Sequence, residues 1–243
     1  MIKGIFNSAS AMVPRVKQQE AIANNLANVS TPGFKKDGVF VRELSDAQAR
    51  RLPGKSDWER PMIDQVYTDS QQGSFDRTGN PLDVAIEGAG FFVARAEDGV
   101  ETLMRNGSFS ADELGFLITA NGDMILGSGG AIQIPPGDIA IADDGVISVD
   151  GEEVSRLRVV TVEDPRELKK GDAGKYHLPD GVTAQDAVSY VIRQGFLESS
   201  NVNAITQMVE MIASYRAYEA DSQALKSQDE SLERLIGEVG RTQ

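Results

Sequence analysis

The sequence contains no cysteine and, in 243 residues, only one histidine and one tryptophan. Without cysteine the chain can form neither a disulfide nor a thiolate site, so cysteine-dependent redox chemistry by the chain itself is excluded. The single histidine, His177, has no local partner for a zinc or nucleophilic site. We therefore expect a loop or surface role for it.

Basic residues and long apolar runs are also scarce. The 24 lysines and arginines face 37 aspartates and glutamates, which gives a formal net charge of −13. This charge disfavours nucleic acid and anionic membrane as partners. No apolar run reaches membrane-spanning length, and residues 1–7 lack the apolar core of a secretory signal. We expect no membrane insertion, and either a cytoplasmic protein or one exported without a cleaved signal peptide.

No set of residues in the sequence indicates catalysis, and no cofactor or metal site is expected. Gly88-Ala89-Gly90 is a fragment of a phosphate-binding pattern, but it leads into an apolar strand and not into a helix. Asp143, Asp144, Glu152 and Glu153 are expected in hairpin turns, and their spacing matches no calcium-binding loop. The sequence therefore predicts a protein that is not an enzyme.

A long apolar repeat occupies the C-terminal end of the chain. From residue 204 to residue 239, positions at alternating spacings of four and three are apolar except at Ser222 and Asp229. Because no glycine or proline occurs before Gly237, this pattern predicts one long helix with a coiled-coil-like stripe. A second apolar line beside its first turns makes the apolar arc wider than one neighbour can cover. That line consists of Val202, Ile205, Val209 and Ile212.

The N-terminal residues repeat in the same way. Positions 5–26 predict an amphipathic helix, which Thr31-Pro32-Gly33 should end and which Pro14 should kink or interrupt. Asn24, Asn25 and Asn28 lie near its end. They form either an exposed polar face or a set of amides that bond to neighbouring chains.

The middle of the chain contains two different patterns. Residues 34–81 mix charged runs and prolines with short strand-like stretches, and we expect an extended connector there. From residue 82 the apolar period becomes two, and Asp-Gly or Asn-Gly pairs predict hairpin turns. Strands are expected at residues 82–86, 91–94, 101–104, 116–119, 131–134, 139–141, 146–149, 157–162 and 188–194.

These patterns predict an α+β fold in three parts. Residues 1–33 and 203–243 form a discontinuous helical domain whose two helices pair as a coiled-coil-like stalk. Residues 34–81 form the connector, and residues 82–202 an antiparallel β domain. Burying nine apolar stripe residues contributes roughly 15–25 kcal/mol, whereas ordering the arms costs about 1–2 kcal/mol per residue. The helical arms should therefore be marginal until other chains cover them.

The assembly interface is expected on the two helices. It combines their apolar stripe positions with the three asparagines: Ile5, Met12, Val16, Asn24, Asn25, Leu26, Asn28, Val202, Ile205, Met208, Val209, Met211, Ile212, Tyr215, Tyr218, Leu225, Leu232 and Ile236.

Several motifs resemble those of bacterial flagellar rod and hook proteins. Ala-Asn-Asn-Leu-Ala-Asn-Val-Ser-Thr-Pro-Gly-Phe at 23–34 is similar to the N-terminal signature of that family. Residues 82–92, followed by Arg-Asn-Gly-Ser-Phe at 105–109, resemble the opening of its β domain. Residues 194–203 and Arg-Ala-Tyr-Glu at 216–219 resemble the beginning and the body of its C-terminal helix. The motifs occur in the order of the family and span nearly the whole chain.

The resemblance implies a structural axial subunit of the flagellar basal-body rod that transmits torque from motor to hook. Subunits of this family stack head-to-tail into a helical tube, with the terminal helices inside and the β domain outside. The implied partners are copies of the chain, other rod and hook axial proteins, and the flagellar export apparatus, which exports its substrates without a cleaved signal. The implied location is the periplasm-spanning rod. The chain length and the single β domain favour rod over hook members. The loop at Asp164-Pro165 and the divergent N-terminal helix, with Pro14 and Lys17, favour proximal-rod over distal-rod members.

Two functions of other classes are also considered. One is a glycan-binding or protein-binding β module on a coiled-coil stalk, which would need an exposed aromatic cluster, whereas Trp58 lies outside the expected β domain. The other is a hydrolase built on paired carboxylates. The expected turn positions of the acidic residues argue against it.

Overall fold

The computed structural model describes the backbone of residues 2–44, 60–179 and 181–239. It also describes the side chains of these residues, except those of 2–11, 40–44, 60–65, 173, 232 and 235–239.

The chain forms two compact units. The first, called here the helical unit, takes residues 1–27, 37–69 and 203–243, and the second, the β unit, takes residues 28–36 and 70–202. The sequence predicted a separate connector at 34–81. In the structure this stretch is divided between the two units, because its middle part pairs into a hairpin of the helical unit and its two ends bond within the β unit.

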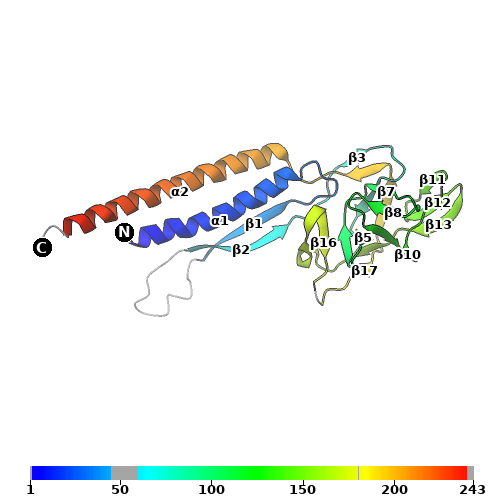
Figure 1. Cartoon of the computed structure of the whole chain (residues 1–243), viewed down its shortest axis with the longest axis horizontal. Helices are drawn as coiled ribbons and strands as arrows, with labels where there is room; N and C mark the ends of the chain where they lie inside the picture. Colours follow the sequence, from blue (N-terminus) through cyan, green and yellow to red (C-terminus); the bar gives the residue numbers. More distant parts are fainter. Residues whose placement is uncertain (1, 45–59, 180, 240–243) are drawn as a thin grey trace. The chain divides into compact units, whose positions relative to one another are not determined.

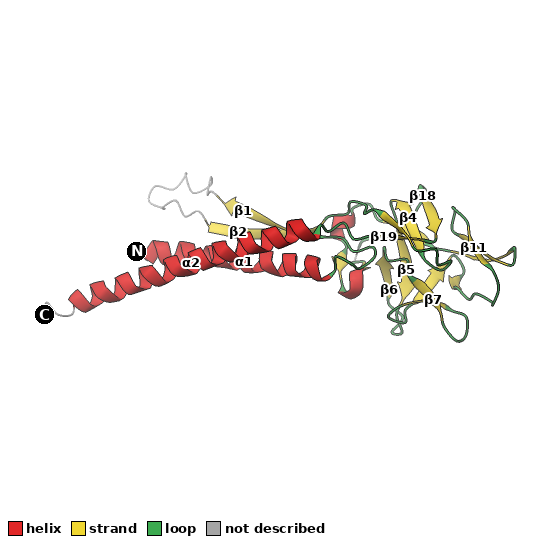
Figure 2. Cartoon of the chain, turned by 90° about the horizontal axis from the view of Figure 1, so that it is seen from above, coloured by secondary structure: helices red, strands yellow, loops and turns green. Residues whose placement is uncertain are grey.

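The helical unit contains two helices and one hairpin. Helix α1 (Ile2–Ala27) lies beside α2 (Ala204–Val239), and β1 (Asp37–Leu44) pairs with β2 (Arg60–Thr68) alongside α1 (Figures 1 and 2). The hairpin is antiparallel, with a register shift between Phe40 and Val41. Helix α1 continues through Pro14, which was expected to kink or interrupt it. A proline removes one main-chain hydrogen bond, and here the turns on both sides of it remain helical.

Helix α2 begins with an asparagine cap. The side-chain oxygen of Asn203 accepts a hydrogen bond of 3.0 Å from the main-chain N–H of Thr206. The carbonyl oxygen of Asn203 accepts the first helical bond, from Gln207, also at 3.0 Å. Such a cap satisfies an N–H group that the first turn of a helix leaves without a partner. With no glycine or proline before Gly237, the helix then runs for 36 residues.

The β unit is built from short antiparallel strands, which confirms the predicted class of sheet. Its main sheet has the order β15-β16-β6-β5-β9-β8-β7, with β10 on β9, β14 on β5 and β17 on β14. Three smaller sheets are β11-β12-β13, β18-β4 and β19-β3. The strands are β3 (Phe75–Arg77), β4 (Val84–Gly88), β5 (Phe91–Arg95), β6 (Glu101–Met104), β7 (Phe109–Ala111), β8 (Leu117–Thr119), β9 (Met124–Gly127), β10 (Gly130–Ala131), β11 (Ile139–Ile141), β12 (Val146–Val149), β13 (Glu152–Arg156), β14 (Val159–Thr161), β15 (Lys169–Lys170), β16 (Lys175–His177), β17 (Gln185–Asp186), β18 (Tyr190–Gln194) and β19 (Phe196–Glu198).

Strand β5 lies between two hydrophobic clusters. Phe92 packs in the larger cluster, edge-on to Phe109 at a ring-centroid distance of 5.2 Å. Phe91 packs in the smaller cluster, edge-on to Tyr176 at 5.5 Å. Because successive side chains of a strand point to opposite faces, a strand buried on both faces must be apolar throughout. This explains why the Phe-Phe-Val-Ala run does not alternate with polar residues.

The predicted hairpin turns are confirmed where a glycine follows an acidic residue or an asparagine. Gly99, Gly122, Gly145 and Gly151 all have positive φ. They connect β5 to β6, β8 to β9, β11 to β12 and β12 to β13. Asp143 and Asp144 lie in such a turn as expected, whereas Glu152 and Glu153 open strand β13.

Gly107 provides a test of the packing in the β unit. A Cβ atom at this position would lie 1.7 Å from the carbonyl oxygen of Val84. Gly107→Ala is therefore expected to lower the free energy of unfolding by about 3 kcal/mol or more and Tm by roughly 6–12 °C. Gly129→Ala is the matched control, because its Cβ would meet no atom within 4 Å. Calorimetry of both variants measures the effect, and equal Tm values would contradict the close approach.

Candidate assembly surface

An apolar face of α2 is exposed in this chain. It lies along the first three turns of the helix, and each of its five side chains is at least 50% exposed: Ile205, Met208, Val209, Ile212 and Tyr215. Val13 and Val16 on α1 are also exposed, at 60% and 39%. Clustered apolar side chains of this kind mark surfaces that other chains cover.

The stripe of α2 that contacts α1 is more polar than the sequence suggested. Gln207 and Ser214 are buried, and Met211, Tyr218, Asp221 and Leu225 are half-buried. The predicted stripe included Met208 and Tyr215, and both are exposed. Two of the polar residues on this side have partners on α1, since Gln207 bonds to Asn25 and Asp221 to Arg15. The hydroxyl of Ser214 is buried without a hydrogen-bond partner among the described residues.

Among the described residues, two side-chain hydrogen bonds join the helices. The guanidinium of Arg15 donates to the carboxylate of Asp221 at 2.5 Å, and the amide of Asn25 donates to Gln207 at 3.0 Å. The first pair is partly exposed and contributes little to stability. Each contact nevertheless forms at only one alignment of α1 on α2. Polar contacts between helices therefore set the register, at a cost in stability.

Asn25 joins three elements of the helical unit. It is 1% exposed. Its side-chain oxygen accepts from the N–H of Asp37 at 2.8 Å, and its NH₂ donates to the carbonyl of Asp37 at 2.8 Å as well as to Gln207. The Asp37 carboxylate in turn accepts from Thr68 at 2.8 Å and from Asn24 at 3.4 Å. The buried amide therefore forms hydrogen bonds within the chain, and these connect α1 to β1 and to α2.

Three charged groups meet in the interior of the β unit. The fully buried carboxylate of Glu198 accepts from the Lys35 ammonium, from Arg105 at 3.4 Å and from the N–H of Gly73 at 3.0 Å. Lys35 also donates to the carbonyl of Gln71 at 2.7 Å. Burial lowers the pKa of Arg105, and the nearby Glu198 raises it, so the guanidinium keeps its charge. We call Lys35, Arg105 and Glu198 the junction cluster.

The junction cluster lies where the chain leaves the β unit. Three segments next to those exits form hydrogen bonds with one another. They are residues 33–36, 71–74 and 198–201. Gly33 has φ +69°, and a Cβ there would lie 2.5 Å from the main chain of Arg105, so only glycine fits. The connecting hydrogen bonds run from Gly33 N to Glu198 O (2.7 Å), Ser199 N to Ser74 O (2.8 Å), Lys36 N to Asn201 Oδ1 (2.7 Å) and Asn201 Nδ2 to Gln71 O (3.1 Å).

The predicted interface residues fall into four groups. The exposed ones are Val16, Asn24, Ile205, Met208, Val209, Ile212 and Tyr215. The half-buried ones are Met12, Leu26, Asn28, Met211, Tyr218 and Leu225, and the buried ones are Asn25 and Val202. The side chains of Ile5, Leu232 and Ile236 lie outside the described residues, as does Trp58.

The roles of Lys35, Arg105 and Glu198 could not be predicted from the sequence. They appeared only within or beside family-like motifs, and isolated charges carry no periodic signal. The part of the chain that the structure describes has no group of three or more His, Asp or Glu side chains that could hold a metal ion. Among its described helices, none is long and apolar enough to span a membrane.

Three family models match the chain. The model for "Flagella basal body rod protein" matches residues 5–35. The "Flagellar hook protein FlgE/F/G D1 domain" matches residues 85–149, and the "Flagellar basal body rod FlgEFG protein C-terminal" matches residues 193–238. The first and third models cover most of α1 and α2, and the second covers much of the β unit.

Relatives of the chain extend over its whole length. It is 34% identical to the flagellar basal-body rod protein FlgF of Salmonella typhimurium, over 95% of this chain and 96% of the relative. It is 30% identical to FlgF of Caulobacter vibrioides, over 99% of each. It is 29% identical to the rod protein FlgG of Bacillus subtilis, over 97% of this chain and 98% of the relative.

Asn25→Ala tests the role of the buried amide. The substitution leaves both main-chain groups of Asp37 and the amide of Gln207 without their partner, a loss of about 3 kcal/mol. Hydrogen exchange at the Asp37 N–H should then be about 100-fold faster, because each 1.4 kcal/mol corresponds to a factor of ten. Asn24→Ala, at an exposed position next to it, should change the rate by less than about threefold. Equal rates in the two variants would contradict the role of Asn25.

Glu198→Gln tests the junction cluster. The change leaves the buried cations of Lys35 and Arg105 without a carboxylate, which costs about 3–5 kcal/mol. The urea concentration at which half of the β unit is unfolded should therefore fall, because the folded state is less stable. Glu87→Gln is the control, because Glu87 forms an exposed ion pair with Arg193 at 2.7 Å, and its loss should cost less than about 1 kcal/mol. An unchanged midpoint in Glu198→Gln would exclude an important role for the cluster.

Proposed function

Because the chain belongs to the family of flagellar basal-body rod proteins, it is a structural subunit of the flagellum and not an enzyme, and we propose how it assembles there. In our proposal, copies stack head-to-tail into a helical tube, with α1 and α2 pairing as a coiled-coil-like stalk in its inner layer. The exposed apolar face of α2 is the observation that carries this proposal.

The contacts between α1 and α2 support a division of roles around α2. Polar residues on one side of the helix, including Gln207 and Asp221, set the register on α1. The apolar side chains on another side remain exposed and are left for neighbouring subunits. This differs from a self-sufficient helical pair, in which the most apolar stripe would be buried between the two helices.

The size of the apolar face supports assembly through several weak contacts. Burying the exposed parts of five apolar side chains contributes roughly 5 kcal/mol. Fixing two molecules together costs about 4–15 kcal/mol. One such contact is therefore insufficient for a stable dimer, and each added subunit must touch several neighbours. The subunit would remain monomeric in dilute solution and join only an existing end of the rod.

The direction of stacking follows from the difference between the exposed surfaces. The apolar face of α2 carries five residues, whereas the described side chains of α1, from residue 12 onward, expose Val13 and Val16. A contact between unlike surfaces repeats from copy to copy, and in our proposal its rotation does not close a ring, so the assembly is an open helix. Such a tube would transmit torque from motor to hook through its subunit contacts.

Among rod proteins we assign the chain to the proximal-rod type, FlgF, in preference to the distal-rod type, FlgG. Alignments to the FlgF relatives cover 244–251 positions. Those to the FlgG relatives cover 263–267, although this chain has only 243 residues. The FlgG alignments therefore need more gaps. The partners would be copies of the chain and other rod and hook axial proteins in the periplasm-spanning rod, reached through the flagellar export apparatus without a cleaved signal.

Ile212→Asp tests the proposed assembly. A charge at the centre of the apolar face should prevent incorporation into the rod and abolish motility, because the carboxylate would be buried against a neighbour without a partner. Folding should be unaffected, since Ile212 is 55% exposed.

Ala224→Asp is the matched control for Ile212→Asp. It adds the same charge to an exposed position of α2 away from the apolar face. The measurement is the amount of each variant in isolated basal bodies, together with circular dichroism of the purified chains. Normal incorporation of Ile212→Asp would overturn the proposal.

A further inference from the structure

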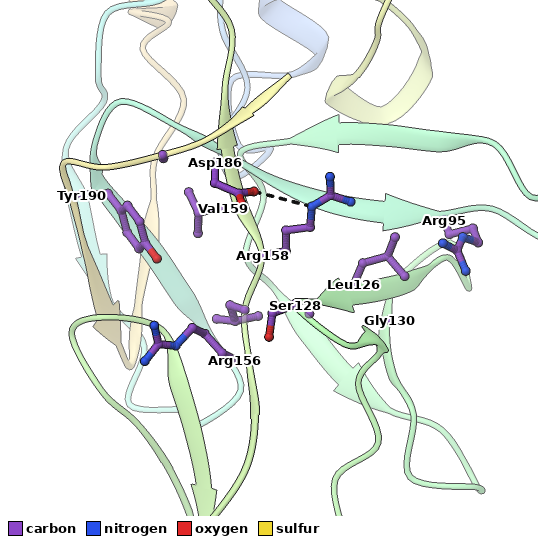
Figure 3. Close-up of a pocket in the computed structure, with 12 residues that line it drawn as sticks. Arg95, Leu126, Ser128, Gly130, Arg156, Arg158, Val159, Asp186 and Tyr190 are labelled. Carbon is purple, nitrogen blue, oxygen red and sulfur yellow. Dashed lines mark ion pairs between the residues drawn. The ribbon is translucent and has the colours of Figure 1, made fainter. Parts of the chain in front are cut away.

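A cleft of about 550 Å³ in the β unit is lined by three arginines. Arg95 comes from β5, Arg156 from β13 and Arg158 from the segment before β14. Figure 3 shows the three arginines around the cleft, with Asp186 beside Arg158. Leu126, Leu157, Val159 and Tyr190 also line it. Burial raises the pKa of the Tyr190 phenol, which keeps this hydroxyl a neutral donor.

The ion pairs of these arginines are weak and exposed. The carboxylate of Glu101 forms ion pairs with both Arg95, at 2.9 Å, and Arg158, at 3.4 Å. Asp186 lies 3.9 Å from Arg158 and is 87% exposed. The Arg156 guanidinium bonds to Asp144 at 3.0 Å. Exposed pairs contribute at most about 1 kcal/mol, and a guanidinium has five N–H donors. Carboxylates from another molecule can therefore join or replace these partners at small cost.

An acidic tip lies at the other end of β13. Asp150, Glu152 and Glu153 fall within four residues at the β12–β13 turn, and all three are exposed. Asp150 accepts a hydrogen bond from the N–H of Asp138 at 2.9 Å. Among the described residues, no lysine or arginine forms an ion pair with the carboxylate of Glu152 or Glu153.

The tip and the cleft cannot meet within one molecule. Glu152 begins β13, and Arg156 ends it. A strand rises about 3.4 Å per residue, so the two ends are roughly 14 Å apart. The strand is held by its pairing with β12, which prevents it from folding back on itself. Only a second copy can bring the tip to the cleft. Because the two surfaces differ, such a contact would repeat from copy to copy.

We propose that the acidic tip of the β12–β13 hairpin of one copy binds in the arginine cleft of the next copy. The carboxylate of Glu153 would face Arg156 and Arg158, and arginine binds carboxylates through paired N–H groups. The contact gives the β unit its own head-to-tail interaction, in addition to the apolar face of α2. It rests on the proposed function, since it assumes that copies of the chain are neighbours.

The test uses the absence of cysteine in the natural chain. Ser128→Cys places a thiol in the cleft, and Glu152→Cys places one at the tip, with Glu153 retained. Mixing the two full-length variants at low ionic strength under mild oxidation should give a disulfide-linked heterodimer, and a chain with both substitutions should give a ladder of oligomers. Glu97→Cys, in the acidic β5–β6 turn, replaces Glu152→Cys in the control.

Charge reversal makes the test specific. Arg156→Glu with Arg158→Glu in the Ser128→Cys chain should lower the crosslinking yield at least about tenfold. Glu153→Arg in the Glu152→Cys chain should restore it. A yield equal to that of the Glu97→Cys control, or one insensitive to charge reversal, would overturn the contact.

The crosslinking result is independent of the test on α2. If Ile212→Asp fails to assemble but no specific crosslink forms, the cleft contact alone is refuted. If Ile212→Asp assembles normally, the role of the helix face is refuted, and the crosslinking yield still decides the cleft contact. Circular dichroism of each cysteine variant verifies that its fold is retained.

Discussion

The buried carboxylate of Glu198 is the group on which the rest of the structure most depends. It holds the Lys35 ammonium and the Arg105 guanidinium inside the β unit, where any one of these charges would be costly without the others. Its neighbours include the segments that follow α1, follow β2 and precede α2. The β unit therefore holds together, within itself, the three segments in which its chain begins or ends.

In the helical unit, the contacts between elements and the exposed surface use different kinds of side chain. Contacts within the chain use polar groups, such as the amide of Asn25 and the ion pair between Arg15 and Asp221. Those contacts specify alignment but contribute little net stability. The more hydrophobic side chains of α2 stay on the surface. In the proposed assembly, neighbouring subunits would cover these side chains and so stabilise the helical unit.

The sequence predicted local structure well where a single residue or a short period determines it. The Asp-Gly and Asn-Gly turns were predictable because glycine tolerates positive φ. The helical arms followed from their apolar repeat. The repeat did not show which side of α2 faces α1, because it reveals that a helix has an apolar stripe but not which neighbour covers it. The hairpin of β1 and β2 was missed, since its strands pair across a long insertion and show no regular alternation.

The sequence by itself determined the α+β class, the antiparallel β unit, the two terminal helices and the flagellar rod family, since all of these depend on local patterns and motifs. Only the tertiary structure decided which stripe of α2 faces α1, how residues 34–81 divide between the units, and that Lys35, Arg105 and Glu198 meet. The physical reason is distance along the chain. Residues separated by 70 or more positions come together through the packing of whole elements, and the pairing of buried charges has no period that a sequence can display.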